Sequence, residues 1–268
     1  MTSTSYVTRA LLTFATALVL SPVSVLAQDN TGLPELITDR PDFTESSDVV
    51  GRGIVQLEMG TTFESNKMGA DQDRTMSTPL ALARIGVSKR LELRFSTDGY
   101  VLDSLRSGFG QATTKGQADI EVGAKFVLSN GARTRGLAMA VIPMASLPTG
   151  SDAMSSDTVD PTVKFTWAKD LPRDFSLSGN YNINRLGDEL GRYTEQALSF
   201  SLGHDLAGGW GGYWETYGFM PKGRPGMAAW TTLCFNTLWN APNAILPRKL
   251  TCTTPPPGWP SPRFRKPA

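Results

Sequence analysis

Hydrophobic and polar residues alternate along much of the chain, most clearly in residues 80–100, LALARIGVSKRLELRFSTDGY. Apolar residues stand at odd positions on either side of a polar turn at residues 88–90, with arginine or glutamate between them. Because successive side chains of a strand point to opposite faces, each arm has one apolar and one charged face. Two such arms joined by a short turn predict an antiparallel β-hairpin.

The same alternation predicts seven further strands, so that nine can be proposed in all. Each is close to the 9–11 residues, roughly, with which a tilted strand crosses a bilayer. The seven cover residues 54–64, 117–128, 136–147, 159–169, 175–184, 194–204 and 210–220.

The predicted connections alternate in length from Gly53 onward. The longer ones are residues 65–77, 103–116, 148–158 and 185–192, and the shorter ones are 88–90, 129–135, 170–174 and 205–209. A transmembrane barrel has short periplasmic turns and longer external loops, whereas a soluble lipocalin-like barrel has no such requirement. The connections therefore favour a transmembrane barrel.

Alternation alone leaves open which face of the sheet is inside. In a soluble barrel the apolar face would form the interior and bind a small hydrophobic ligand. In a membrane barrel the apolar face would meet lipid, and the polar face would line a wet lumen. The predicted lumen-lining residues are then Glu58, Arg84, Glu92, Arg94, Asp98, Glu121, Lys125, Lys164, Asn180 and Asn182.

The N-terminus has the features of a cleaved export signal. Arg9 precedes an apolar run at residues 10–20 that is too short for a stable membrane helix, and Val25-Leu26-Ala27 suits signal peptidase. We expect residues 1–27 to be removed after Ala27. No later apolar run approaches 18 residues, so a helical anchor is not expected.

Residues 28–50 are polar and rich in turn-forming residues, with TDRPDFTES at 38–46. Proline restricts the residue before it to extended geometry, so we expect a fixed irregular segment rather than a helix. We interpret it as an N-terminal periplasmic, plug-like segment. Its part near the periplasmic mouth is predicted to be Asp39, Arg40, Pro41 and Asp42.

Residues 228–268 differ from the rest of the chain. They hold five basic residues, no acidic residue and many prolines, whereas residues 28–227 hold 20 basic and 25 acidic residues. No basic patch indicates nucleic-acid binding. We expect the barrel over residues 51–227 and interpret the tail as a frameshift product. The alternative is a genuine tail, with closure by other strands; about twelve strands are expected for an even-numbered closed barrel.

No catalytic constellation stands out. The single histidine, His204, has no GxSxG nucleophile elbow to accompany it, and no acidic or cysteine spacing matches a metal or phosphate site. We therefore predict no enzyme activity, no catalytic residues, no cofactor and no metal.

Four stretches together carry a family resemblance: TDRPDFTES (38–46), GRGIVQLEMGTTFE (51–64), RIGVSKRLELRFSTDGY (84–100) and GQADIEVGAKFVL (116–128). They resemble the "MetA-pathway of phenol degradation" family of transporter-like proteins of Gram-negative bacteria. The resemblance implies an all-β, antiparallel up-and-down barrel in the outer membrane, a passive transporter or channel for small aromatic or hydrophobic compounds. Its implied partners are outer-membrane lipid, periplasmic chaperones, the barrel-assembly machinery and such a solute. The alternative is a soluble periplasmic barrel that binds a small hydrophobic ligand.

Overall fold

The computed structural model describes residues 37–40, 43–68, 71–108, 110–129, 136–188, 191–206, 210–223, 229–241 and 244–249. The predicted signal peptide, Pro41, Asp42 and the tail from residue 250 lie outside the described residues. The chain divides into two units, and all described residues belong to the second, Leu36–Ala268. Within the described ranges, no helix is long and apolar enough to cross a membrane.

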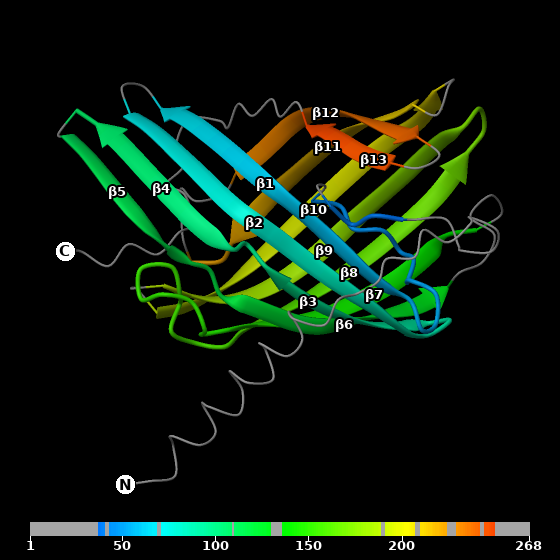
Figure 1. Ribbon diagram of the computed structural model, residues 1–268, viewed down its shortest axis with the longest axis horizontal. Coiled ribbons are helices and arrows are strands. Elements are labelled where there is room, and N and C mark those ends of the chain that lie inside the picture. The colour runs from blue at the N-terminus through cyan, green and yellow to red at the C-terminus, as the bar shows by residue number, and fades with distance from the viewer. Residues whose placement is uncertain are drawn as a thin grey trace, which may run out of the picture. The chain divides into compact units, whose positions relative to one another are not determined.

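The described residues of the second unit form one sheet of thirteen strands, and every strand pair in it is antiparallel (Figure 1). The strands are β1 (Val55–Met68), β2 (Asp71–Ser88), β3 (Leu91–Thr97), β4 (Tyr100–Ser107), β5 (Gly110–Gln117), β6 (Ile120–Ser129), β7 (Ala138–Leu147), β8 (Asp160–Leu171), β9 (Phe175–Asp188), β10 (Gly191–Leu206), β11 (Trp210–Pro221), β12 (Ala229–Ala241) and β13 (Ala244–Lys249). From β6 to β13 each strand pairs with the next in sequence, which is an up-and-down arrangement.

The long strand β2 explains the order of the other strands, β1 to β5, in the sheet. One edge of β2 pairs with β1, while the other edge pairs with β3 along residues 81–88 and with β4 along residues 72–78. The chain bends between β3 and β4 at Gly99, whose φ is 68° and whose added Cβ would lie 2.1 Å from the carbonyl oxygen of Pro79. Only glycine fits such a bend without displacing the neighbouring backbone. β3 and β4 are therefore two parts of one interrupted strand, and β5 and β6, which pair with them, are two parts of the next.

The sheet is curled into a half-barrel, with its strands running obliquely (Figure 1). Among the described strands, no pairing joins β1 to β13. The all-β, antiparallel, up-and-down architecture predicted from the sequence is confirmed.

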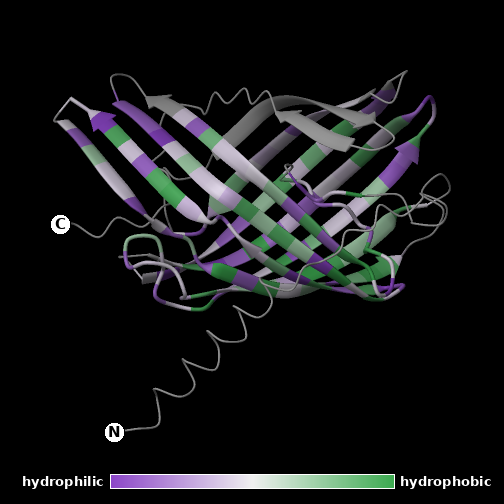
Figure 2. Cartoon of the chain, in the orientation of Figure 1, coloured by the Kyte–Doolittle hydropathy of each residue, from purple (hydrophilic) through white to green (hydrophobic). Residues whose placement is uncertain are grey.

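The polar face of the sheet is the buried one. In β3, Glu92 and Arg94 are 0% and 2% exposed, whereas Leu93 and Phe95 are 39% and 43% exposed. The same inversion holds in β1, where Gln56 is buried and Val55 is 68% exposed. Figure 2 shows hydrophilic and hydrophobic residues alternating along the strands. An apolar outer face around a polar interior is the pattern of transmembrane barrels.

Each of the nine predicted strands has a counterpart in the sheet, but three of the four longer predicted loops were wrong. Residues 65–68 and 71–77 instead extend β1 and β2, residues 103–116 belong mostly to β4 and β5, and residues 185–188 and 191–192 extend β9 and β10. Most residues of these extensions are polar on both faces, as in DQDRT at the start of β2 and GQATTKGQ in β5. Their pairing rests on backbone hydrogen bonds, which leave no alternating signal in the sequence. The predicted loop at 148–158 does separate β7 from β8.

The sheet also continues past residue 227, where we had expected it to end. β12 and β13 lie within the tail that lacks a clear alternation. The backbone ladder between β11 and β12 includes a register shift between Trp214 and Thr216. A register shift interrupts the strict alternation of side chains between the two faces of a strand. This is one reason why the sequence pattern of β12 did not predict a strand.

The described part of the N-terminal segment, residues 37–40 and 43–50, has no regular secondary structure and precedes a turn beside the end of β2. Gly53 N donates to Gly86 O at 2.8 Å, and Gly86 N donates to Ile54 O at 2.9 Å. A Cβ on Gly86 would lie 2.0 Å from the carbonyl oxygen of Gly51, so only glycine allows this approach. The segment therefore reaches β1 close to the turn at Lys89 and Arg90.

Candidate functional site

Eight charged side chains meet in one buried group on the inner face of the sheet, and we call this group the ion cluster. It is connected by ion pairs throughout. Its members are the acids Asp39, Glu45, Glu58 and Glu92 and the bases Arg84, Arg94, Lys125 and Lys164. Six of them were predicted as lumen-lining residues, whereas Asp39 was predicted at the periplasmic mouth and Glu45 was not singled out.

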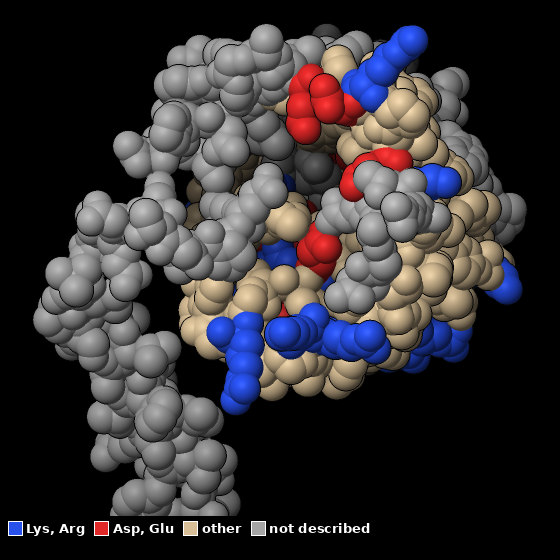
Figure 3. All heavy atoms as spheres, turned by 90° about the vertical axis from the view of Figure 1, so that its right-hand side faces the viewer, with Lys and Arg blue, Asp and Glu red and all other residues tan. Residues whose placement is uncertain are grey.

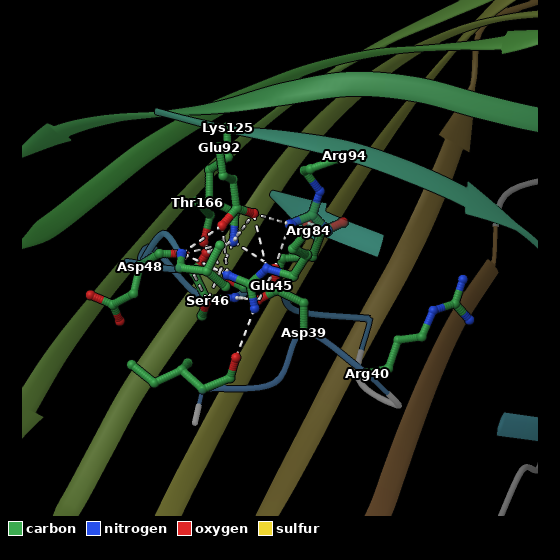
Figure 4. A network of polar contacts seen from close by, with 12 residues as sticks. Asp39, Arg40, Glu45, Ser46, Asp48, Arg84, Glu92, Arg94, Lys125 and Thr166 are labelled. Carbon is green, nitrogen blue, oxygen red and sulfur yellow. Dashed lines mark hydrogen bonds and ion pairs between the residues drawn. The ribbon is translucent and has the colours of Figure 1, made fainter. Parts of the chain in front are cut away.

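The hairpin of β2 and β3 forms one side of the ion cluster (Figure 4). Arg84 and Arg94 lie directly opposite each other in the strand register, an arrangement that is unfavourable for like charges. Glu92 lies between them and accepts from Arg84 Nε at 3.0 Å and from Arg94 Nη1 at 2.8 Å. The carboxylate of Glu92 thus offsets the repulsion between the two arginines.

Asp39 comes from the N-terminal segment and lies among the bases of the sheet (Figure 4). Its Oδ2 accepts from Arg94 Nη1 at 2.5 Å and from Lys125 Nζ at 2.6 Å, and Arg84 Nη1 lies 3.5 Å away. Its Oδ1 accepts from the backbone N–H of Ser46 at 2.8 Å. One carboxylate thus joins three cations and also closes a loop of its own segment.

Glu45 supplies the second carboxylate of the segment. One of its oxygens lies 2.7 Å from Arg94 Nη2, and the other accepts from Lys164 Nζ at 2.5 Å. Its backbone carbonyl accepts from Thr166 Oγ1 at 2.6 Å. The segment is therefore attached to β3 and β8 at the same residue.

The sheet also binds the backbone of the segment. Glu58 accepts from the N–H groups of Asp39 and Arg40 at 3.0 and 2.9 Å. Arg84 Nη2 donates to Asp48 O at 2.9 Å, and Lys125 Nζ donates to the carbonyl oxygens of Ser46 and Asp48 at 2.9 and 3.1 Å. These contacts satisfy backbone groups that form no ladder of their own.

A second attachment lies on β9–β11. Glu215 accepts from the backbone N–H groups of Phe43 and Thr44 at 3.2 and 2.6 Å, and Thr44 Oγ1 donates to Ser199 Oγ at 2.7 Å. The Phe43 ring is stacked on Tyr217, with centroids 4.6 Å apart, and meets Phe219 edge-on at 5.4 Å. Glu215 was not predicted from the sequence, because Trp210–Pro221 is aromatic on both faces and its alternation is unclear.

The charges of the ion cluster balance only when the segment is included. The sheet contributes four bases and two acids, and the segment contributes the remaining two acids. Burial by itself would raise the pKa of Asp39, but Lys125, Arg94 and Arg84 outweigh burial and hold that pKa well below its usual range. Burial likewise opposes ionisation of Glu45, but Arg94 and Lys164 lower its pKa to about 2. Both carboxylates are therefore ionised at neutral pH.

The other predicted lumen-lining residues lie outside the ion cluster. Asp98 is exposed in the bend between β3 and β4, because the chain leaves the regular strand there. Glu121 is half-buried and accepts from Ser96 Oγ at 2.8 Å. Asn180 and Asn182 are buried, and Asn180 Nδ2 donates to Phe43 O at 3.3 Å. Arg40 is half-buried beside Glu58.

Figure 3 shows acidic and basic side chains around a hollow at the end of the molecule that lies on the right in Figure 1. Among the described residues, no group of three or more His, Cys, Asp or Glu side chains could hold a metal ion. The arrangement can hold anionic groups and backbone carbonyls on one curved wall. It offers hydrogen bonds and charge rather than a reacting centre.

An antiparallel up-and-down sheet that is apolar outside and polar within defines the class of this protein, that of β-barrel proteins of the outer-membrane type. The family model described as "Putative MetA-pathway of phenol degradation" matches residues 38–222. The chain belongs to this family, as its sequence resemblance indicated. No curated protein and no solved structure matches the chain.

Proposed function

We propose that the chain is an outer-membrane β-barrel that provides a passive path for small compounds, without enzyme activity. The inverted distribution of side chains carries this proposal. Exposed Val55, Leu57, Met59 and Phe63 form an apolar outer row on β1. Such a row is costly in water and favourable in lipid.

The interior supports passage of a solute rather than a reaction. It presents ion pairs and amides on the curved wall, with Glu58, Lys125 and Asn182 facing inward from three different strands. Polar inner walls of this kind tune the selectivity of barrels. The family description adds phenol degradation, so a small aromatic compound is the solute class that we propose.

A soluble periplasmic barrel with a hydrophobic ligand is the second candidate. It requires an apolar interior, and the interior of this sheet is instead occupied by the ion cluster and by residues 37–40 and 43–50. The outer-membrane proposal also implies contact with lipid, and help from periplasmic chaperones and the barrel-assembly machinery during export.

Location is tested by fractionating cells that express the full chain and by comparing boiled with unboiled samples on gels. We expect the protein in the outer-membrane fraction, with a band that shifts on heating because a folded barrel migrates differently. A soluble periplasmic protein without a heat-dependent band would refute the membrane location.

Passage is tested by two measurements on the same protein. Planar bilayers should show stepwise conductance, and cells that lack the gene should take up phenol more slowly than cells that carry it. Normal uptake together with silent bilayers would leave the barrel without a transport role.

A further inference from the structure

We propose that residues 148–158, which connect β7 to β8, are a fixed loop folded against the inner face of the sheet at the external mouth, where they limit the size of the solutes that enter. The inference rests on the proposed function and narrows its solute class by size. Figure 1 shows the loop at the left end of the molecule, opposite the end with the turn between β2 and β3. The longer connections of a transmembrane barrel lie on its external side.

A glycine of β5 shows which face of the sheet the loop covers. In β4, Val101 is 2% exposed and Leu102 is 39% exposed, so Val101 belongs to the inner face. Gly116 is directly opposite Val101 in the strand register, and opposite residues of an antiparallel pair project to the same face. A Cβ on Gly116 would lie 1.8 Å from Ser151 Oγ and 3.2 Å from Met154 Cγ. The loop therefore occupies the place of an inward side chain.

One carboxylate holds both ends of the covering part of the loop, residues 149–155. Asp119 lies between β5 and β6, and its Oδ1 accepts from the backbone N–H groups of Thr149 and Gly150 at 3.0 and 2.8 Å. Its Oδ2 accepts from Ser155 Oγ at 3.2 Å, and Ser155 is only 4% exposed. Hydrogen bonds to an ionised acceptor are stronger than those between neutral groups. Asp119 is therefore the positioning residue of the loop.

The loop is also ordered within itself. Ser151 O accepts from the N–H groups of Met154 and Ser155 at 2.8 and 2.9 Å, which closes a single tight turn. The N–H of the same serine donates to the carbonyl oxygen of Gln117 at 3.0 Å, so the turn is attached to the end of β5. A segment held in this way opens only when several contacts break together. It is therefore a standing part of the wall, and the width of a pore sets which solutes pass.

The first experiment measures the size limit with a cysteine placed on the inner wall beneath the loop. Thr162 is opposite Met144 in the strand register, and Met144 is 7% exposed, so Thr162 also faces inward. It lies further into β8 than Asp160, the first residue of that strand. The variant T162C is made with Cys234 and Cys252 replaced by serine. Intact cells are treated with maleimides that carry polyethylene glycol chains of increasing length.

Two substitutions release the loop, and each has a matched control. Asp119→Ala removes the carboxylate that holds the loop, whereas Asp152→Ala removes an exposed acid of the same loop. Gly116→Val fills the place of the loop on the inner face, whereas Gly108→Val adds the same side chain where an added Cβ meets nothing within 4 Å. The heat-dependent band on gels shows whether each variant is folded.

We expect short maleimides to label T162C at the same rate in all variants, and long maleimides to do so only where the loop is released. The loss of three hydrogen bonds to a carboxylate should raise the rate with long reagents about tenfold or more in Asp119→Ala. Gly116→Val should act in the same direction, and the two controls should label like the parent. Equal rates in released and control variants, all of them folded, would overturn the size limit.

The second measurement separates this inference from the channel function. Conductance of the same variants is recorded in planar bilayers with polyethylene glycols of increasing length. Larger conductance and entry of longer polyethylene glycols in Asp119→Ala and Gly116→Val alone would support both proposals. Silent bilayers for every variant, together with faster labelling of the released ones, would refute the channel and support the loop as a size limit. Parent-like conductance and equal labelling in all variants would keep the channel and overturn the role of the loop.

Discussion

Asp39 is the side chain whose replacement tests the ion cluster most directly. In Asp39→Asn the shape is kept and one negative charge is lost, so the balanced cluster acquires a net charge of +1. The contacts of Oδ2 with Arg94 and Lys125 lose their ionic character, while one amide oxygen can still accept from Ser46 N. Lys125 is then left fully buried without its closest acid.

The cost follows from the burial of these groups. Breaking a buried ion pair by removing one partner costs about 3–5 kcal/mol, because a charge remains buried without compensation. The retained hydrogen bond from Ser46 places Asp39→Asn near the lower end, at about 3 kcal/mol. Lys125→Met should cost about as much, because Asp39 loses one of its two short cation contacts and the backbone carbonyl oxygens of Ser46 and Asp48 each lose a donor.

The assay is equilibrium unfolding in urea of protein reconstituted in lipid vesicles, followed by tryptophan fluorescence. A double-mutant cycle compares Asp39→Asn, Lys125→Met and the combination. The double variant should be less destabilised than the sum of the two single variants by about 1–3 kcal/mol, because neutrality is restored. Additive effects, or single variants as stable as the parent, would refute the role assigned to this ion pair.

Three further outcomes are expected from the same unfolding assay. The pKa of Glu45 is lowered from 4.5 to about 2 in the folded protein, so its carboxylate stabilises the fold above pH 4.5, and this stabilisation is lost as the pH falls towards about 2. Glu45→Gln should therefore remove about 3 kcal/mol of the stability that the parent protein loses in acid. An unchanged pH dependence of unfolding in the variant would contradict this role of Glu45. Gly86→Ala should destabilise the fold by more than about 1 kcal/mol, because an added Cβ would collide with the backbone of Gly51. Gly60→Ala should be close to neutral, because an added Cβ there meets nothing within 4 Å. Equal effects of the two substitutions would refute the close approach of the Gly51 backbone to β2. If the outer face of the sheet meets lipid, Ile183→Arg should cost about 2–4 kcal/mol of stability. Val87 is equally exposed but lies beside a turn, so Val87→Arg should cost only about 0–1 kcal/mol. Similar small costs for both variants would argue that the outer face lies in water.

Several parts of the fold could be predicted from the sequence because their cause is local. Alternation located nine strands, and the resemblance to the family indicated an up-and-down barrel. β5 and the second half of β4 could not be predicted in this way, because residues 103–117 are mostly polar on both faces and their pairing rests on the backbone ladder. Loop 103–116 was expected there for that reason.

The hairpin of β2 and β3 illustrates what local pattern can say about a site. Spacing placed Arg84, Glu92 and Arg94 on one face, and the strand register brings them together. Asp39 and Glu45 could not be assigned by the same reasoning. Asp39 lies 86 residues before Lys125, and Glu45 lies 119 residues before Lys164, and no periodicity connects irregular segments to strands at such distances.

By itself, the sequence determined that the strands have two unlike faces, because a period of two follows from the geometry of the extended chain. It did not determine which face is buried, since the same alternation suits a barrel in lipid and a barrel in water. Only the tertiary structure decided that the charged face turns inward and that residues 37–40 and 43–50 lie against it. The reason is electrostatic: the strands contribute four bases and two acids to the ion cluster, and Asp39 and Glu45, which come from elsewhere in the chain, balance that local excess of positive charge.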